Sequence, residues 1–329
     1  MKAILNHLFE HKYLEKEKAK EVLMDIGTGK YNQSQITAFI AAFMMRSVNV
    51  DELMGFKEAL LELCIPVDLS DYDTIDLCGT GGDGKNTFNI STLSSFVVAA
   101  AGYKVAKHGN YGVSSVCGSS NVLEKLGYEF TSSEDELKSQ IDNNGICFMH
   151  APLFHPAMKY VGPIRRELGM KTFFNMLGPL VNPSKPNHQI VGVFNLELAR
   201  LYKYLHQSSD KKYAIIHALD GYDEVSLTGN FKLIANDTDT VYSSKDLGLS
   251  TYKEEELYGG ETIEEAVAIF KKVIAGEGTD AQISAVSANA GLAIWCFDQS
   301  RSMVDCVAQA REALVSGKAN QVLKSVLNK

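Results

Sequence analysis

From Thr74 onward, short β-type runs alternate with helical runs, and this alternation limits the fold more than any other feature. Apolar and β-branched runs predict strands at 74–78, 103–106, 146–149, 189–194, 213–217, 231–235 and 240–243. Three- and four-residue apolar spacing predicts helices at 91–101, from 119, at 134–143, 262–275, 281–297 and 302–316. Such alternation is typical of βαβ units, so we predict an α/β domain with a mostly parallel central sheet.

The chain before this alternation has only helical patterns. Apolar residues recur at helical spacing in Ile36, Phe39, Ile40 and Phe43, and Asp51 is the expected N-cap of a helix that ends near residue 64. We therefore predict a small all-helical domain before the α/β domain.

Breaks in the pattern predict the domain boundaries. Pro66 and the acidic stretch 68–73 separate the helical part from the first strand. The segment at about 160–186 is rich in Gly, Pro and Arg and interrupts the alternation. We expect residues 1–66 to form the helical domain, joined by this crossing segment, and residues 67–159 and 187–329 to form the α/β domain.

Composition excludes several classes of partner. The formal net charge of -8 and the pI of about 5.5 argue against binding nucleic acid or anionic lipid. The longest apolar run, 38–45, is far shorter than the roughly 20 residues of a membrane helix. Six cysteines form no C-x-x-C pair and are expected to be reduced thiols. We expect a cytoplasmic protein with a small-molecule partner and no membrane contact.

A glycine-rich loop follows the first predicted strand and precedes a helix. Its sequence, Cys-Gly-Thr-Gly-Gly-Asp-Gly-Lys-Asn-Thr, occupies 78–87. Glycines let the backbone approach an anion with several N–H groups, and the helix terminus adds a favourable dipole. The loop is therefore a candidate phosphate site, although a tight connection without a ligand is the simpler alternative.

Two familiar nucleotide-binding motifs fit this loop poorly. Its glycines match G-x-G-x-x-G, but a dinucleotide site also needs an acidic residue about 20 residues on, and the second strand ends in the basic run 107–108. A Walker A loop needs Ser or Thr after its lysine, where this chain has Asn86. The negative charge of Asp83 would also repel a polyphosphate bound directly in the loop. The remaining interpretation is a loop whose backbone binds pyrophosphate while Asp83 faces ribose hydroxyls or metal-bound water.

Polar residues in two further segments of the chain support this interpretation. Asn89, Ser91 and Thr92 lie at the start of the next helix, where side chains cap helices or hold phosphate and Mg²⁺. A second polar loop at 107–115 follows the second strand and leads to Gly-Ser-Ser at 118–120. Both loops are expected at the carboxyl ends of strands, which is where open α/β sheets bind ligands.

Taken together, the motifs resemble those of the anthranilate phosphoribosyltransferases, within the wider nucleoside phosphorylase class II fold. The matching segments are 79–83, 89–92, 107–110, 165–169, 174–183 and 221–226. The resemblance implies the nucleoside phosphorylase/phosphoribosyltransferase type of fold, with an α/β domain that binds phosphoribosyl pyrophosphate (PRPP). It also implies transfer of the 5-phosphoribosyl group to anthranilate in tryptophan biosynthesis, Mg²⁺ as cofactor with two ions expected, and a homodimer through the helical domain.

The resemblance also implies roles for individual residues. Lys107, His108 and Asp83 are the expected catalytic residues, and Ser91, Asp223 and Glu224 the expected metal ligands, since Mg²⁺ prefers one or two carboxylates with water and phosphate. The expected substrate-binding residues are Gly79, Gly82, Asp83, Thr87, Asn89, Ile90, Ser91, Thr92, Lys107, Gly109, Asn110, Ser115, Ser119 and Arg165. Arg165 matches the family position for the anthranilate carboxylate.

Some positions depart from the family pattern and leave alternatives open. Tyr111 stands where Arg is common, Val116 and Cys117 replace more polar residues, and Asn121 stands where Asp is frequent. A pyrimidine nucleoside phosphorylase shares a similar Lys-His-x-Asn loop, and a non-catalytic binding protein on the same fold would have lost the carboxylates or the glycine loop. Both features are intact here, which favours an enzyme.

Overall fold

The chain forms two compact units in the computed structural model, which describes residues 1–112, 116–207 and 209–327. The first unit consists of Met1–Val67 and Ala151–Lys185, and the second of Asp68–His150 and Pro186–Lys329. Each unit has its own core of buried apolar side chains.

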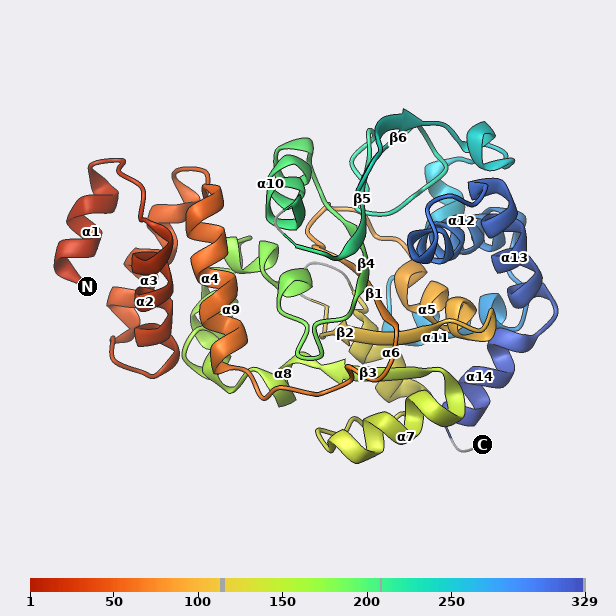
Figure 1. Ribbon diagram of the computed structural model, residues 1–329, viewed down its shortest axis with the longest axis horizontal. Coiled ribbons are helices and arrows are strands. Elements are labelled where there is room, and N and C mark those ends of the chain that lie inside the picture. The colour runs from red at the N-terminus through yellow and green to blue at the C-terminus, as the bar shows by residue number, and fades with distance from the viewer. Residues whose placement is uncertain (113–115, 208, 328–329) are drawn as a thin grey trace. The chain divides into compact units, whose positions relative to one another are not determined.

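The first unit is entirely helical (Figure 1). Its amino-terminal part contains α1 (Lys2–Phe9), α2 (Lys16–Gly27), α3 (Gln33–Met44) and α4 (Val50–Leu63). Its second segment contains α8 (Ala151–Phe154), η1 (Pro156–Tyr160), α9 (Gly162–Leu168), η2 (Phe173–Met176) and η3 (Gly178–Leu180). An aromatic cluster joins the two segments: Phe39, Phe43 and Phe56 pack around Phe173, with 4.7 Å between the ring centroids of Phe56 and Phe173.

The crossing into the helical unit begins earlier than the sequence pattern indicated. Residues 151–159 were expected in the α/β domain, and this expectation is wrong. The third strand of the sheet ends at His150, after which Phe154 is fully buried and its carbonyl accepts the Ile65 N–H at 2.8 Å. The turn η1 that follows contacts α2 and α4, which brings the segment into the helical unit.

The N-cap of α4 also differs from the prediction. Asn49, and not Asp51, caps the helix: its Oδ1 accepts the Glu52 N–H at 2.8 Å, and the Glu52 carboxylate accepts the Asn49 N–H at 3.1 Å. Glu52 is fully buried, accepts the Leu14 N–H and pairs with Arg46. Asn49 and Glu52 thus form a reciprocal capping box, and the helix starts two residues earlier than the predicted cap at Asp51 implies.

A seven-stranded sheet forms the centre of the second unit, in the order β3-β2-β1-β4-β5-β6-β7. The first five strands in this order are parallel: β3 (Ile146–His150), β2 (Lys104–Gly109), β1 (Thr74–Gly79), β4 (His188–Gly192) and β5 (Lys212–Ala218). The strands β6 (Phe231–Ala235) and β7 (Asp239–Tyr242) add antiparallel at one edge. Gly79 pairs with Gly192 and Gly109 with His150. The carboxyl ends of β1, β2, β3 and β4 therefore lie side by side along one end of the sheet.

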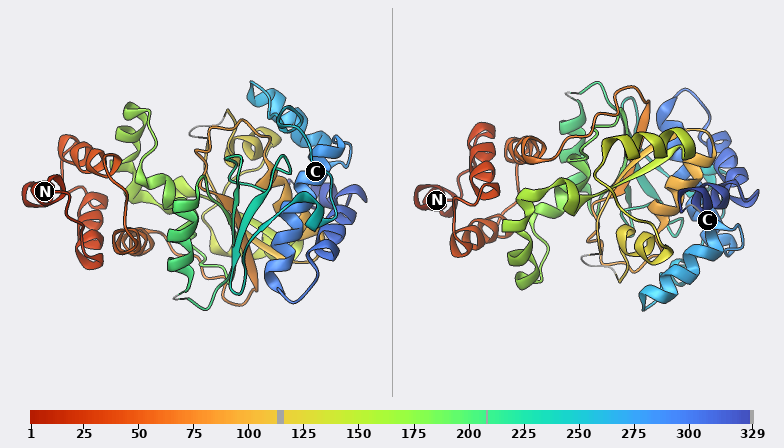
Figure 2. Two further views of the ribbon diagram at one scale, coloured as in Figure 1. Left: turned by 90° about the horizontal axis from the view of Figure 1, so that it is seen from above. Right: turned by 90° about the horizontal axis from the view of Figure 1, so that it is seen from below.

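Helices cover both faces of this sheet. They are α5 (Ile90–Ala100), α6 (Ser119–Leu126), α7 (Glu134–Asn144), α10 (Leu196–Gln207), α11 (Ile263–Ile274), α12 (Asp280–Phe297), α13 (Met303–Val315) and α14 (Lys318–Val326), with short turns η4 (Ser244–Leu247) and η5 (Glu254–Leu257). In Figure 1, α12 and α10 lie on opposite sides of β5, and both views in Figure 2 keep the blue carboxyl-terminal helices on one side of the strands.

The predicted fold class, a helical domain with an α/β domain around a mostly parallel sheet, is confirmed. Every strand expected from the sequence is present within about three residues of its predicted ends, while α10 and α14 were not anticipated. Within the part of the chain that the structure describes, no helix combines the length and apolar character needed to cross a membrane.

Candidate active site

The glycine loop continues directly from the end of β1. Gly81, Gly82 and Gly84 have φ angles of 62°, 77° and 77°, which is the left-handed region that side chains disfavour. The Thr80 N–H donates to the Gly192 carbonyl at 2.9 Å, and Asp83 accepts the Lys85 N–H at 3.0 Å. The loop is therefore bonded to β4 at its start and to its own aspartate in the middle.

A distant segment, 254–260, holds the second half of the loop. Asn86 accepts the Gly259 N–H through its carbonyl at 2.8 Å and donates its side-chain amide to the Gly260 carbonyl at 2.8 Å. Thr87 forms a β-bridge with Tyr258, and Lys85 pairs with Glu254 at 2.8 Å. Thr87, predicted to bind substrate, is thus fixed by pairing of its backbone.

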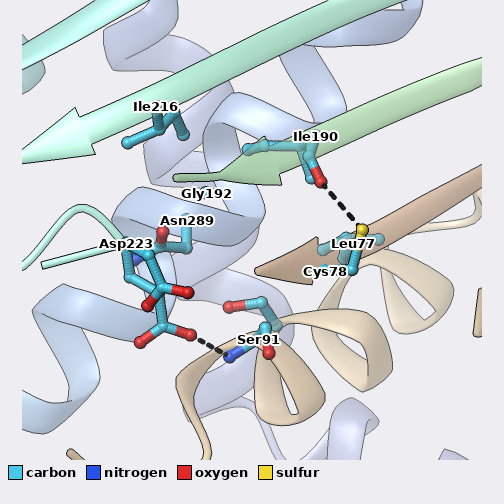
Figure 3. Close-up of a pocket in the computed structure, with 10 residues that line it drawn as sticks. Leu77, Cys78, Ser91, Ile190, Gly192, Ile216, Asp223 and Asn289 are labelled. Atoms are coloured by element: carbon cyan, nitrogen blue, oxygen red, sulfur yellow. Dashed lines mark hydrogen bonds between the residues drawn. The ribbon is translucent and has the colours of Figure 1, made fainter. Parts of the chain in front are cut away.

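Asp223 and Glu224 lie in the loop after β5 and reach both polar segments near β1. Asp223 accepts the Gly81 N–H at 2.7 Å, and Glu224 accepts the Ser91 N–H at the start of α5 at 3.0 Å. Figure 3 shows the second of these bonds beside Asp223 and Asn289. The structure therefore brings together Ser91, Asp223 and Glu224, the three predicted metal ligands.

Glycines at two strand ends make room for Asp223. A Cβ on Gly79 would lie 2.4 Å from the Asp223 carboxylate, and one on Gly192 would lie 1.4 Å from the Asp223 carbonyl oxygen. Real side chains do not tolerate such distances. Gly79, predicted as a contact for phosphate, has a second reason to be glycine here, which is the approach of the carboxylate.

Burial strongly affects the charges at this site. Burial, together with the negative charge of Asp83, raises the pKa of Asp223 to about 7, and burial with the Asp223 charge raises the pKa of Glu224 well above its usual range. A bound cation would reverse this effect, because it favours the ionised carboxylates.

Lys107 and His108, at the end of β2, point to opposite faces of the sheet because successive strand residues alternate. The Lys107 ammonium donates to the Leu77 carbonyl, and burial lowers its pKa. Lys107 lines a small hollow with Gly109 and Ser119, whereas His108 does not line it and donates its backbone N–H to Asp76 at 3.1 Å.

The loop after β2 connects to the start of α6 through Asn110. The Asn110 carbonyl accepts the Ser119 hydroxyl at 3.2 Å, and a Cβ on Gly109 would lie 2.4 Å from the Ser119 Oγ. Asn89 joins the two polar loops, since its amide donates to the Cys117 carbonyl at 2.9 Å. These predicted substrate-binding residues thus lie along one edge of the sheet.

Several of the positions that depart from the family pattern have local partners. The Tyr111 hydroxyl donates to Glu124 at 2.7 Å, and its ring packs edge-on against His150. Asn121 accepts the N–H groups of Gly112 and Gly118 at 2.9 and 3.0 Å. Tyr111 therefore connects the loop after β2 to α6 by a hydrogen bond.

The other predicted site residues have different surroundings. The side chains of Ile90 and Thr92 are buried, with 1% of each exposed. Arg165 belongs to the helical unit, where its guanidinium lies 5.5 Å from the Phe174 ring and donates to Asn175 at 3.3 Å. Ser115 lies outside the described residues.

A small hollow, partly open to solvent, lies beside the acidic pair (Figure 3). Besides Ser91, Asp223 and Glu224, it is lined by Asn289 of α12, which the sequence analysis did not select. An asparagine inside a run of small apolar residues was the one available signal.

The donor set fits Mg²⁺. Two adjacent carboxylates and a serine are hard oxygen donors, and Mg²⁺ uses few protein ligands together with water and substrate phosphate. Among residues 1–112, 116–207 and 209–327, no group of three His, Cys, Asp or Glu side chains is spaced to hold a metal by itself.

Comparison with known proteins agrees with this architecture. Residues 2–64 match the helical bundle domain, and residues 71–320 the a/b domain, of a glycosyl transferase family. Fold and site thus define a two-domain glycosyl transferase. The chain is 58% identical to the anthranilate phosphoribosyltransferase of Cytophaga hutchinsonii, over 99% of this chain and 100% of that one.

Solved structures show the same fold. The anthranilate phosphoribosyltransferase of Thermus thermophilus is 32% identical and has a TM-score of 0.88, with 98% of each chain covered. The enzyme of Saccharomyces cerevisiae, solved with PRPP and Mg, is similar in fold, with 24% identity, a TM-score of 0.90, and coverage of 98% of this chain and 96% of that one. The chain belongs to the anthranilate phosphoribosyltransferases, and the resemblance inferred from its motifs is confirmed.

Proposed function

We propose that this protein transfers the 5-phosphoribosyl group of PRPP to the amino group of anthranilate, releasing pyrophosphate, in tryptophan biosynthesis. Identity of 58% over the whole chain to an enzyme of that name supports the reaction. The observation that carries the proposal is the pair of hydrogen bonds that Asp223 accepts from Gly81 and Glu224 accepts from Ser91. These bonds connect a glycine loop suited to binding phosphate with an acidic pair suited to binding Mg²⁺.

Leaving-group stabilisation accounts for most of the catalysis. The bond between ribose C1 and the pyrophosphate oxygen breaks with its electron pair on pyrophosphate, and positive charge develops on the ring. Backbone N–H groups of the glycine loop and the Lys107 ammonium are suited to the charge on the departing group. Bound Mg²⁺, held by Ser91, Asp223 and Glu224, would neutralise part of that charge. Two ions are expected, and this number remains a prediction.

The nucleophile requires little help. The anthranilate nitrogen forms its bond to C1, becomes acidic, and then loses its proton to solvent, so a strong general base is not needed. Arg165 is the proposed partner of the anthranilate carboxylate, because a planar guanidinium can donate to both oxygens. Asp83 is proposed to face the ribose hydroxyls or metal-bound water.

Assembly and location complete the proposal. We expect a homodimer through the helical unit, as the family resemblance implies, and light scattering after size exclusion tests it directly. All six cysteines are free thiols, in keeping with the reducing cytoplasm that we propose as its location.

The decisive test is the loss of anthranilate fluorescence with PRPP and Mg²⁺. A parallel phosphorolysis assay with thymidine and uridine tests the nucleoside phosphorylase alternative. We expect activity in the first assay only. Phosphorolysis without anthranilate consumption would reject the proposed function, and inactivity in both assays would favour a binding protein.

A further inference from the structure

Asn289 is an unusual residue for its position in the chain. It lies in α12, where residues 283–296 are all buried and most of them are apolar. Only 6% of Asn289 is exposed. A buried amide without hydrogen bonds would destabilise the protein, so its partners indicate why this helix contains it.

The Asn289 amide bonds to both backbone groups of Val225. Its Oδ1 accepts the Val225 N–H at 3.0 Å, and its Nδ2 donates to the Val225 carbonyl at 3.0 Å and to the Ala285 carbonyl at 2.8 Å. Both amide hydrogens and the oxygen are therefore used. One side chain thus pairs with Val225 much as a neighbouring strand would.

Val225 directly follows the acidic pair in the sequence. On the other side of that loop, the Asp223 carbonyl oxygen lies so close to Gly192 of β4 that any side chain at position 192 would collide with it. The backbone of the pair is thus confined by β4 at Asp223 and bonded to α12 at Val225. Asn289 also lines the same hollow as Asp223 and Glu224 (Figure 3).

We propose that Asn289 is a positioning residue that sets the backbone of the Asp223–Glu224 loop, and with it the aim of both carboxylates toward Mg²⁺ and pyrophosphate. The inference rests on the proposed function, which gives the acidic pair its ligands. Other buried polar residues of α12 do not share this role. Ser287, for example, donates to the Ile283 carbonyl of its own helix at 2.7 Å.

The test compares Asn289→Ala with Ser287→Ala. Asn289→Ala leaves both backbone groups of a buried residue without these partners, so the loop should shift to regain hydrogen bonds. We expect the half-saturating Mg²⁺ concentration to rise by about tenfold, equivalent to about 1.4 kcal/mol. The kcat should fall, while the KM for anthranilate should change much less. Ser287→Ala removes a buried bond of the same helix and should leave the Mg²⁺ titration unchanged.

A second readout does not depend on activity. Mg²⁺ with pyrophosphate should raise the melting temperature of the wild type and of Ser287→Ala, and raise that of Asn289→Ala much less at the same concentrations. If Asn289→Ala fails to fold, Asn289→Ser replaces it, because a serine hydroxyl can bond to the Ala285 carbonyl within the helix.

The outcomes separate the two proposals. A folded Asn289 variant with a normal Mg²⁺ titration and a normal melting shift would show a purely structural role and overturn the inference. An equal loss in Ser287→Ala would overturn it as well. A wild type that is inactive with anthranilate would reject the proposed function, and the melting shifts would still decide whether Asn289 positions the acidic pair.

Discussion

Two adjacent carboxylates, Asp223 and Glu224, dominate the chemistry of the site at the scale of single residues. Asp223 is buried and Glu224 is half-buried, and each accepts one backbone N–H, from Gly81 and Ser91 respectively. One hydrogen bond each does not offset the burial, so the pKa of both carboxyl groups is raised. A cation bound at the pair would stabilise the ionised form of both carboxyl groups.

Removing the two charges should therefore weaken the response to metal. In the double variant Asp223→Asn, Glu224→Gln, which nearly preserves shape, the rate should fall and the half-saturating Mg²⁺ concentration should rise by at least about tenfold. The measurement is the initial rate of anthranilate consumption across a Mg²⁺ titration. An unchanged titration curve would mean that the pair is only a structural turn.

Gly79 offers a second test at this scale. Gly79→Ala places a Cβ 2.4 Å from the Asp223 carboxylate, so the acid must move and the KM for PRPP should rise severalfold or more. The bulkier Gly79→Val, and Gly82→Val within the loop, should be still more damaging.

Gly84→Ala is the matched control for Gly79→Ala. A Cβ there meets nothing within 4 Å, although the φ of 77° costs about 1 kcal/mol of stability. Its KM for PRPP should stay closer to the wild type. Equal effects of the two substitutions would refute the link to Asp223.

At the scale of elements, helix ends and strand ends carry the functional residues. Three loops leave the carboxyl ends of β1, β2 and β5, and each supplies part of the site. In the first unit, Glu52 completes the capping box of α4 and also accepts the Leu14 N–H, which ties the start of α4 to the segment before α2.

The cap of α4 gives a test of stability. Asn49→Ala should reduce the free energy of unfolding by about 1 kcal/mol, because the Glu52 N–H loses its acceptor. Asp51→Ala, at an exposed position in the first turn, should cost only a few tenths of a kcal/mol. Urea unfolding followed by circular dichroism measures both. Equal losses in the two variants would contradict the assignment of the cap.

Two adjacent arginines of the short helix α9 allow a test of the proposed binding site for the anthranilate carboxylate. Arg165 and Arg166 diverge by roughly 100° around the helix, and Arg165 is half-buried over Phe174 while Arg166 is exposed. Loss of a charge-assisted pair should cost on the order of 2 kcal/mol. Arg165→Ala should therefore raise the KM for anthranilate at least tenfold, with that for PRPP much less affected and Arg166→Ala milder. Similar behaviour of the two variants, or a PRPP defect in Arg165→Ala, would refute the assignment.

For the whole molecule, the raised pKa of Asp223 links stability to pH. Between about pH 4 and 7 the folded protein retains a proton that the unfolded chain has released, so the free energy of unfolding should fall as pH rises through this window. The decrease should be on the order of a few kcal/mol and should be smaller in Asp223→Asn.

Trp295, the single tryptophan of the chain, is buried in α12 and reports unfolding of the α/β unit in this experiment. Urea melts of the metal-free wild type and of Asp223→Asn at several pH values give the two slopes. If the two proteins show parallel pH dependence, Asp223 is not the group that holds the proton. Mg²⁺ with pyrophosphate should stabilise the wild type most above pH 7, where the carboxylate is ionised.

The sequence by itself determined the features that depend on local pattern. Alternating apolar runs located the strands, helical spacing located most of the helices, and the glycines of 79–84 predicted a loop between the first strand and the next helix. These features were predictable because hydrophobic periodicity and glycine conformation act within a few residues. The family motifs added the predicted roles of the site residues, which their positions alone could not supply.

Only the tertiary structure decided the features that depend on distant partners. Gly81 meets Asp223 across 142 positions of sequence, Ser91 meets Glu224 across 133, and Asn289 bonds to Val225 across 64. The same holds for the early crossing at Ala151, since the Phe154 carbonyl accepts the Ile65 N–H from a segment much earlier in the chain. Such contacts form when packing brings separate segments together, and no local pattern in either segment specifies the other.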